Sequence, residues 1–431
     1  MWSHRGRWLV PGALVLGVTA IAGGWPGSAT AGASTAAVAP GAQINVGAIS
    51  SRTGPLAGFF GGLAPGMIAY FKAIDAKGGV NGHKIVLTAN LDDGGSPSQF
   101  TQLTHTLIDQ DHVFAAAVAS AWFTPNYFVA TKTPTYGYNV TANWQTSPNL
   151  FAVGGSTQIY SSAYSSLSWF LKKINAKSVA FVSYGPAIAS SYDACSAYAK
   201  AMKNQGYSVY SDVSAQLGGS YASDVQRMQQ AGSQAVITCM QASDDITMGR
   251  DIQQYGLKVK QLWLNGYDQA LLNQYKSVMQ GVYVDDVGDV PFEAANTSKY
   301  GNTYPGMQQY VTAMKKYEPS YVLNSVSFDG WQSAALLAAG IRAAGNNNLT
   351  QANVINATNT MTNFTAGGLS SLVNWKVSHT SYTVPSCTNY VQVQSGKYVT
   401  VFTKNKQVFV CVNTNVKNPA VVTPPKGTPG A

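Results

Sequence analysis

The chain has 431 residues, only 10% of them are charged, and its formal net charge at pH 7 is +9. This length exceeds what one compact core usually holds and is enough for two domains. The basic residues are scattered and never form a run of five, so the composition argues against a nucleic-acid-binding surface.

The N-terminus has the pattern of a secretory signal peptide. Two arginines precede an apolar run over residues 9–22, and small residues follow it. We therefore assign residues 1–31 to a signal peptide, with cleavage after Ala31 or Ala33. No cysteine lies near this point to carry a lipid, and no second run of 18 apolar residues follows. The sequence predicts a protein exported to the periplasm or the extracellular side of the envelope, without a lipid anchor or a membrane-spanning helix.

Residues 44–87 read as a strand, a glycine-rich turn, a helix and a second strand. INVGAI is a short apolar run that ends before turn residues. Apolar residues then recur at helical spacing from Met67 to Ile74, which places them on one helix face. Gly78 and Gly79 supply the backbone freedom that a helix C-terminus needs. The pattern predicts a βαβ unit.

The motifs of this opening form a recognisable series. TGP is followed by Phe59, four residues beyond the proline, and then by AIDAKGGVNGHKI. This series resembles the start of the leucine/isoleucine/valine-binding proteins, which are type I periplasmic binding proteins that supply ABC transporters. The resemblance implies an α/β fold of two Rossmann-like lobes with parallel sheets, joined by a hinge that the chain crosses three times.

Beyond the opening, strand-like runs alternate with helix-like segments. Examples are VFAAAVAS before TPNYFVAT, SVAFVSY before SSYDACSAYAKAMKNQG, and AVITCM before SDDITMGRDIQQYG. Such alternation favours parallel sheets that are covered by helices.

The resemblance also implies where the lobes begin and end. The three crossings are expected near residues 153–156, 284–289 and 367–374. The N-terminal lobe then comprises residues 42–152 and 288–372, and the C-terminal lobe comprises residues 153–287 and 373–415. The alternating segments YVQVQ, YVTVF and QVFVCV predict an antiparallel β-meander added to the second lobe. Residues 416–431 have little apolar content and are predicted to be a disordered tail.

Four cysteines in an exported chain favour two disulfides, Cys195–Cys239 and Cys387–Cys411. Cys239 ends the strand AVITCM, and Cys195 lies in the first turn of the helix after SVAFVSY, so both are expected at the same sheet edge. The second pair flanks the predicted meander. No pair has CxxC spacing and no histidine is close, so a metal site is not expected.

Open parallel sheets bind ligands beyond the carboxyl ends of their strands, so the strand-to-helix turns indicate the site. The turn after VFAAAVA contains Ser120, Ala121 and Thr124, and Pro125 suits the first helical position. The resemblance implies that Ser120 holds the α-carboxylate of the ligand, with Ala121 and Thr124 in the same cradle of N–H groups and hydroxyls. The alternative is that these hydroxyls only cap the helix.

Two further segments of the first lobe are candidates. The turn with Tyr138, Asn139 and Thr141 resembles the second carboxylate-contacting loop of the family, and ordinary turn chemistry is the alternative. Phe59 falls on an aromatic position of the first glycine-rich loop, where its ring can line the pocket or pack in the core.

The second lobe offers Ser191 and Tyr192, which open a helix, and Tyr267 and Asp268, which follow the strand QLWLN. In amino-acid-binding members of the resembled family, a carboxylate in this loop pairs with the ligand ammonium, which makes Asp268 the candidate. Aspartate is also a good N-cap, so a purely structural role stays open. Residues 241–244 lack the aromatic side chain that the resemblance leads us to expect there.

Motifs of catalysis are missing from the sequence. The five histidines are dispersed without an HExxH pair, and there is no phosphate loop and no GxSxG motif. We therefore expect neither enzymatic activity nor a cofactor. The resemblance predicts an extracytoplasmic solute-binding protein for amino acid transport, which captures an amino acid, amide or small carboxylate and delivers it to an ABC permease. The rival prediction is a receptor whose ligand-bound state regulates a signalling partner.

Overall fold

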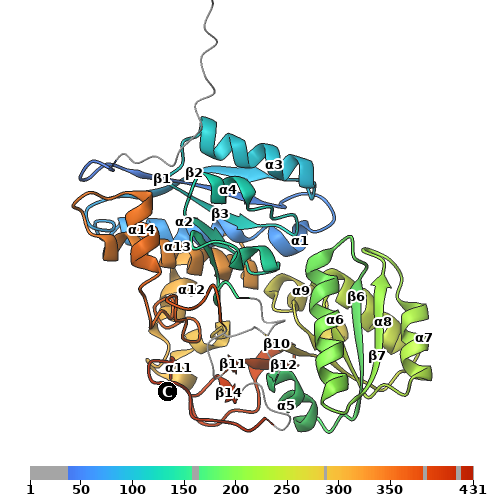
Figure 1. Ribbon diagram of the computed structural model, residues 1–431. Coiled ribbons are helices and arrows are strands. Elements are labelled where there is room, and N and C mark those ends of the chain that lie inside the picture. The colour runs from blue at the N-terminus through green and yellow to red at the C-terminus, as the bar shows by residue number, and fades with distance from the viewer. Residues whose placement is uncertain (1–36, 158–164, 286–288, 382–385, 414–418, 431) are drawn as a thin grey trace, which may run out of the picture. The chain divides into compact units, whose positions relative to one another are not determined.

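The computed structural model describes residues 37–157, 165–285, 289–381, 386–413 and 419–430 (Figure 1). The predicted signal peptide, residues 1–31, lies outside these residues, and so does part of the crossing predicted near residues 284–289. Strands and helices alternate along the described chain, and most strands pair in parallel. The predicted α/β class with parallel sheets is confirmed.

The first sheet has five parallel strands in the order β2-β1-β3-β4-β5. They are β1 (Ile44–Ser50), β2 (Ile85–Asp92), β3 (Ala115–Ala119), β4 (Thr135–Gly137) and β5 (Leu150–Ala152). Every residue of the alanine-rich β3 is buried, as expected for a central strand that is covered on both faces. The helices of this part are α1 (Ala57–Phe60), α2 (Leu63–Asp75), α3 (Pro97–His105), α4 (Asn126–Ala130), α13 (Ser325–Ala344) and α14 (Gln351–Thr358).

The second sheet has seven strands in the order β13-β12-β10-β9-β8-β6-β7. Its parallel strands are β6 (Ser178–Tyr184), β7 (Ser208–Ala215), β8 (Ala235–Thr238), β9 (Lys260–Trp263) and β10 (Tyr283–Asp285). The helices between Ser165 and Met279 are α5 (Ser165–Lys173), α6 (Ala189–Asn204), α7 (Ala222–Gln230), α8 (Ala242–Gln254), α9 (Gln269–Gln274) and α10 (Lys276–Met279). Two more helices, α11 (Thr297–Tyr300) and α12 (Pro305–Tyr317), precede α13.

The predicted three-stranded meander is wrong in its third strand. β12 (Tyr390–Gln394) and β13 (Lys397–Thr400) form an antiparallel hairpin, and β12 extends the second sheet by pairing with β10. β14 (Val410–Val412) pairs instead with β11 (Ser386–Thr388) in a separate two-stranded sheet. The physical reason is the disulfide between Cys387 and Cys411, which are partners in that register.

Much of the predicted disordered tail is ordered. Val421 forms a bridge with Val412, and the Val422 N–H donates to the Cys411 carbonyl at 2.9 Å. The Gln407 side-chain amide donates to the Gly430 carbonyl at 3.0 Å. Backbone pairing with β14 thus orders a segment whose own apolar content is too low to do so.

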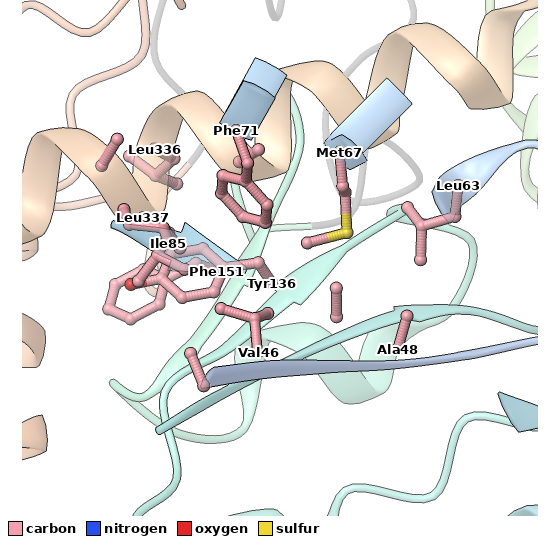
Figure 2. Close-up of a cluster of buried hydrophobic side chains, with 14 of the residues drawn as sticks. Val46, Ala48, Leu63, Met67, Phe71, Ile85, Tyr136, Phe151, Leu336 and Leu337 are labelled. Atoms are coloured by element: carbon pink, nitrogen blue, oxygen red, sulfur yellow. The ribbon is translucent and has the colours of Figure 1, made fainter. Parts of the chain in front are cut away.

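The helices α2 and α13 lie against each other over the first sheet, although some 250 residues separate them in sequence (Figure 1). Figure 2 shows Leu63, Met67 and Phe71 of α2 pointing toward Val46 and Ala48 of β1, with Leu336 and Leu337 of α13 in the same buried cluster. By length and mean hydropathy, which is 1.2, Ala57–Asp75 also has the composition of a membrane-spanning helix. Because α2 contributes its apolar face to the core, this composition is that of a core helix.

Both predicted disulfides are present in the structure, with Cα–Cα distances of 5.9 Å for Cys195–Cys239 and 3.9 Å for Cys387–Cys411. Cys195 lies in the second turn of α6 rather than in the first. Cys239 directly follows β8, so the expected position at the carboxyl edge of the sheet is correct.

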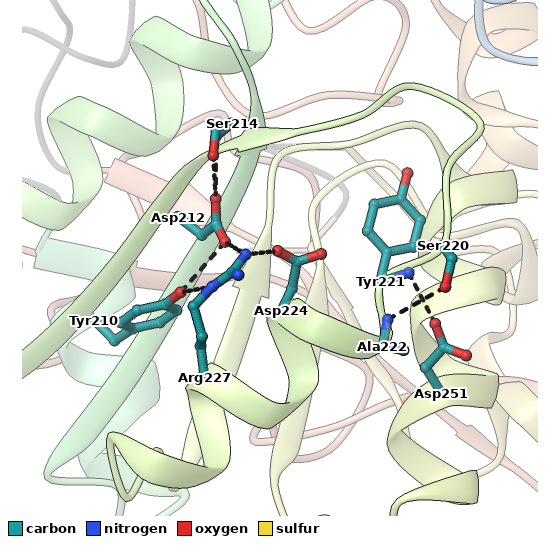
Figure 3. Close-up of polar contacts among 9 residues, drawn as sticks. All are labelled: Tyr210, Asp212, Ser214, Ser220, Tyr221, Ala222, Asp224, Arg227 and Asp251. Atoms are coloured by element: carbon teal, nitrogen blue, oxygen red, sulfur yellow. Dashed lines mark hydrogen bonds and ion pairs between the residues drawn. The ribbon is translucent and has the colours of Figure 1, made fainter.

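A polar cluster lies at the outer edge of the second sheet, between β7 and α7 (Figure 3). The Arg227 guanidinium donates to Asp212 at 2.8 Å and also to Asp224, and both carboxylates are buried. Burial acts to raise the pKa of Asp212, but hydrogen bonds from Asp224, Arg227 and Ser214 outweigh it and lower the pKa to about 2. Burial and the neighbouring Asp212 raise the pKa of Asp224 to about 7. The two carboxylates therefore share one proton below neutral pH.

We expect Arg227→Met to lower the free energy of unfolding by about 1–3 kcal/mol at pH 8, because two buried carboxylates lose the cation that pairs with them. The loss stays in this range because the Arg227 guanidinium is half-exposed and solvent weakens its ion pairs. At pH 5 the loss should be smaller, because Asp224, whose pKa is about 7, holds a proton. In the wild type, the raised pKa of Asp224 removes stability as the pH climbs from about 4 toward 7, whereas the lowered pKa of Asp212 removes stability as the pH falls from about 4 toward 2.

Urea unfolding at pH 5 and pH 8 measures this difference. Lys72→Met is a matched control, because Lys72 forms an exposed ion pair with Glu318 at 3.6 Å and should contribute less than about 1 kcal/mol at either pH. An equal loss for Arg227→Met at both pH values would contradict the shared proton.

Candidate ligand-binding cavity

A cavity of about 180 Å³ lies where loops of the two sheets meet. Its walls come from the segments that follow the carboxyl ends of β1, β4 and β5 in the first sheet and of β6, β8 and β9 in the second. This is the position at which open parallel sheets bind ligands, as the strand-to-helix turns predicted.

The lining residues fall into three groups. The first-sheet loops contribute Leu56, Phe59, Phe60, Tyr138, Asn139, Val140, Val153, Gly154 and Thr157. The strand ends of the second sheet, the loops that follow them and the helix α6 contribute Tyr184, Ile188, Ser190, Ser191, Ala194, Tyr198, Cys239, Met240, Gln241, Leu264, Asn265, Tyr267 and Asp285. The remaining lining residues are Asp289, Ser325, Asp329, Ser371 and Cys387.

Aromatic side chains form much of the wall. The rings of Phe59 and Phe60 meet Tyr138 edge to face, with centroid distances of 5.4 and 6.2 Å. The Tyr138 hydroxyl donates to the Asn265 side-chain oxygen at 3.4 Å, which links a loop of the first sheet to a loop of the second. The site therefore combines contacts from both sheets.

The Tyr184 ring lies beside residues 241–244, a segment that has no aromatic side chain of its own. Its hydroxyl donates to Asp244 at 2.5 Å and accepts from the Gln241 N–H at 3.1 Å. Burial and the neighbouring Asp244 raise the Tyr184 pKa far above its ordinary value, so the phenol stays neutral. These two hydrogen bonds hold the ring against residues 241–244, and the ring lines the cavity there.

Three aspartates line the cavity, namely Asp285, Asp289 and Asp329. Asp289 and Asp329 are buried, with 7% and 4% of their surface exposed. The Gln332 amide donates to Asp289 at 2.9 Å, and the Thr388 hydroxyl donates to Asp285. Burial raises the pKa of Asp285 to about 7.

Five of the predicted ligand-contacting residues line the cavity: Phe59, Tyr138, Asn139, Ser191 and Tyr267. Four of them have side-chain hydrogen bonds within the protein: Tyr138, Tyr267, Asn139 and Ser191. The Tyr138 bond to Asn265 is given above, and the Tyr267 hydroxyl accepts from the Phe292 N–H at 2.6 Å. The Asn139 amide donates to the Gly155 carbonyl at 2.6 Å, and the Ser191 hydroxyl donates to the Cys239 carbonyl at 2.6 Å. These hydrogen bonds fix the positions of the side chains in the cavity wall.

The other six predicted residues do not line the cavity: Ser120, Ala121, Thr124, Thr141, Tyr192 and Asp268. The predicted carboxylate cradle is the main correction. The Ser120 hydroxyl donates to Asp93 at 2.5 Å and accepts from the Trp122 N–H at 3.0 Å. The Thr124 hydroxyl donates to the Trp122 carbonyl at 3.2 Å, and Pro125 rather than Thr124 is the N-cap of α4. Both hydroxyls therefore serve the turn itself.

Asp268 takes the structural alternative that the sequence left open. Its carboxylate accepts from the Leu271 N–H at 2.8 Å and caps α9. Burial raises its pKa, and its side chain does not line the cavity. The carboxylates of the cavity are Asp285, Asp289 and Asp329 instead.

Sequence analysis missed these three aspartates and Asn265. A signal for one of them was present: Asp329 is a lone carboxylate in the largely apolar helix SFDGWQSAALLAAG. A buried charge in such a helix needs a polar environment, which a ligand cavity provides.

The profile of a family described as periplasmic binding protein matches residues 43–397. Similar solved structures include a fatty acid ABC transporter substrate-binding protein from Thermomonospora curvata, with 20% identity and a TM-score of 0.71 over 84% of this chain and 93% of that one. A leucine binding protein from Thermotoga maritima has 16% identity and a TM-score of 0.65 over 83% and 97%. A solute binding protein from R. palustris in complex with benzoate has 16% identity and a TM-score of 0.65 over 83% and 95%. No curated protein sequence matches the chain significantly.

Proposed function

Since the chain belongs to the periplasmic binding protein family, we propose that it captures a small solute in the cavity and delivers it to an ABC permease. The family is made of extracytoplasmic binding proteins, and export through residues 1–31 without a lipid anchor is part of the proposal. The observation that carries it is the cavity itself, which collects side chains from the carboxyl ends of strands in both sheets.

The proposed mechanism is a shift between open and closed states. A ligand that contacts loops of both sheets stabilises their approach, and it can do so only by its differential affinity for the closed state. The Tyr138–Asn265 hydrogen bond supports this, because it joins the two sides at the cavity. We propose lobe boundaries at the crossings expected near residues 153–156, 284–289 and 367–374.

The ligand class proposed is an amino acid, an amide or a small carboxylate. Aromatic and aliphatic walls suit an apolar body, and amides such as Asn139, Gln241 and Asn265 suit a polar group. No reaction is proposed, so the ligand should leave unchanged. Mass spectrometry of the released ligand tests this point.

We expect at least one class of small solute, among amino acids, amides, carboxylates and amines, to raise the melting temperature of the purified protein. A ligand at about 100 times its dissociation constant adds roughly 2.7 kcal/mol, which corresponds to several degrees for domains of this size. A thermal-shift screen with amino acids, amides, carboxylates and amines, followed by calorimetric titration of the hits, measures the effect. A flat response to all four classes would count against solute binding.

A further inference from the structure

Every charged residue among the described lining residues is acidic. Asp285, Asp289 and Asp329 line the cavity, and no Lys, Arg or His does so within the described part of the chain. Residues 158–164 and 286–288, which lie outside the described residues, contain no Lys, Arg or His in their sequence. A ligand that binds here enters a region of negative potential.

The aromatic residues add to this preference. Phe59, Phe60 and Tyr138 form one group of rings on the cavity wall, and Tyr184, Tyr198 and Tyr267 lie on the side of the second sheet. The face of an aromatic ring attracts a cation, and its area also favours an apolar ligand body.

Two groups that were candidates for holding an anion are used within the protein. The Ser120 turn, which was predicted to bind a carboxylate, lies outside the cavity, and its hydroxyl donates to Asp93. At the start of α13, Ser325 lines the cavity, but the Asn324 side chain already accepts from the Ser327 N–H at 2.9 Å. Asp329 lies one turn further along α13, and the nearby positive helix end favours the ionised form of its carboxyl group.

We propose that the cavity selects an organic cation, namely a primary amine or a larger ammonium with an apolar body, and that it needs no ligand carboxylate. This inference rests on the proposed solute-binding function, and it departs from the ligand classes that the resemblance led us to propose, because it disfavours a ligand whose only charge is a carboxylate. An ammonium would be paired by the aspartates and flanked by aromatic faces, whereas a carboxylate would be repelled by the aspartates.

Two sets of matched probes test the proposal. The first is 3-methylbutylamine, leucine and 4-methylpentanoate, and the second is 2-phenylethylamine, phenylalanine and 3-phenylpropanoate. Within each set the apolar body is nearly constant and the charged groups change. Calorimetric titration of the full chain should show at least one amine binding tenfold or more tightly than its matching carboxylate.

The outcomes separate this inference from the function on which it rests. Binding of the carboxylate as tightly as the amine, or binding of neither amine, overturns the cation proposal. Solute binding itself then still stands if any other class in the thermal-shift screen binds, and it fails only if none does.

The variants Asp289→Asn and Asp329→Asn test which side chains are responsible. Each keeps the side-chain shape and removes the charge, and we expect at least a tenfold loss of amine affinity with the carboxylate probe no weaker than before. Asp111→Asn is the control, because Asp111 is exposed and does not line the cavity. Circular dichroism and thermal unfolding identify variants that fold. Unchanged amine affinity in both folded variants overturns the proposal.

Discussion

Gly330→Ala should lower the free energy of unfolding by about 3 kcal/mol, because the new methyl group has no room at the crossing of α2 and α13. A Cβ at position 330 would lie 2.0 Å from the Leu63 carbonyl oxygen. The obstacle is backbone, so no side-chain rotation can relieve it, and the helices must move apart over the core shown in Figure 2. Gly66→Ala meets the same crossing from the other side, with its Cβ 1.8 Å from the Ser327 carbonyl oxygen.

Gly58→Ala is the matched control for this prediction. Gly58 lies in the helix α1, and a Cβ there would meet no atom within 4 Å. This change should be neutral or stabilise by about 0.4–1 kcal/mol through the unfolded chain. The double variant Gly66→Ala/Gly330→Ala should lose less than the sum of the single losses, because one separation of the helices accommodates both methyl groups. Urea unfolding of these four variants and the wild type measures the losses. A loss below about 1 kcal/mol for Gly330→Ala would contradict the prediction, because the helices would then accommodate the methyl group at little cost.

This helix crossing marks the limit of what the sequence predicts. Periodicity predicted α2 from Met67 to Ile74, because one face of the helix lies on a sheet. The helix α2 also packs against α13, which comes some 250 residues later, and local spacing contains no information on that contact. In the sequence, Gly66 and Gly330 only lower the helix propensity of their segments. Their role in the close contact of α2 and α13 is evident only from the structure.

The cavity shows the same division between local and distant information. Its position at the carboxyl ends of the strands follows from the strand-helix alternation. The resemblance of their loops to those of the family led to the prediction of Phe59, Tyr138 and Asn139. Ser120 was misassigned, because the acceptor of its hydroxyl, Asp93, belongs to a different turn 27 residues earlier. The sequence of a turn does not show whether its hydroxyl already has a hydrogen-bond partner elsewhere in the chain.

The prediction of a three-stranded β-meander was wrong for a related reason. Alternation predicts a strand but does not identify its partner, and β14 pairs with β11 rather than with β13. The cysteine spacing supplied the missing constraint, since Cys387 and Cys411 are cross-strand partners. A disulfide proposed from the sequence therefore contained more topological information than the strand pattern did.

Removal of the Cys195–Cys239 disulfide should lower the free energy of unfolding by about 4 kcal/mol, and removal of Cys387–Cys411 by about 3.5 kcal/mol. These values follow from the entropy of closing loops across sequence separations of 44 and 24 residues in the unfolded chain. The variants are Cys195→Ser/Cys239→Ser and Cys387→Ser/Cys411→Ser, and denaturant unfolding with and without a reductant measures the loss.

Each single-disulfide variant also serves as the control for the other. A reductant should remove from each variant only the stability that its remaining disulfide contributes, so both reduced variants should reach nearly the same stability as the reduced wild type. Because Cys239 and Cys387 line the cavity, each variant should also bind the best ligand of the thermal-shift screen more weakly than the wild type does. If either variant unfolds at the same denaturant concentration as the oxidised wild type, that disulfide does not restrict the unfolded chain, and the loop-entropy argument fails for it.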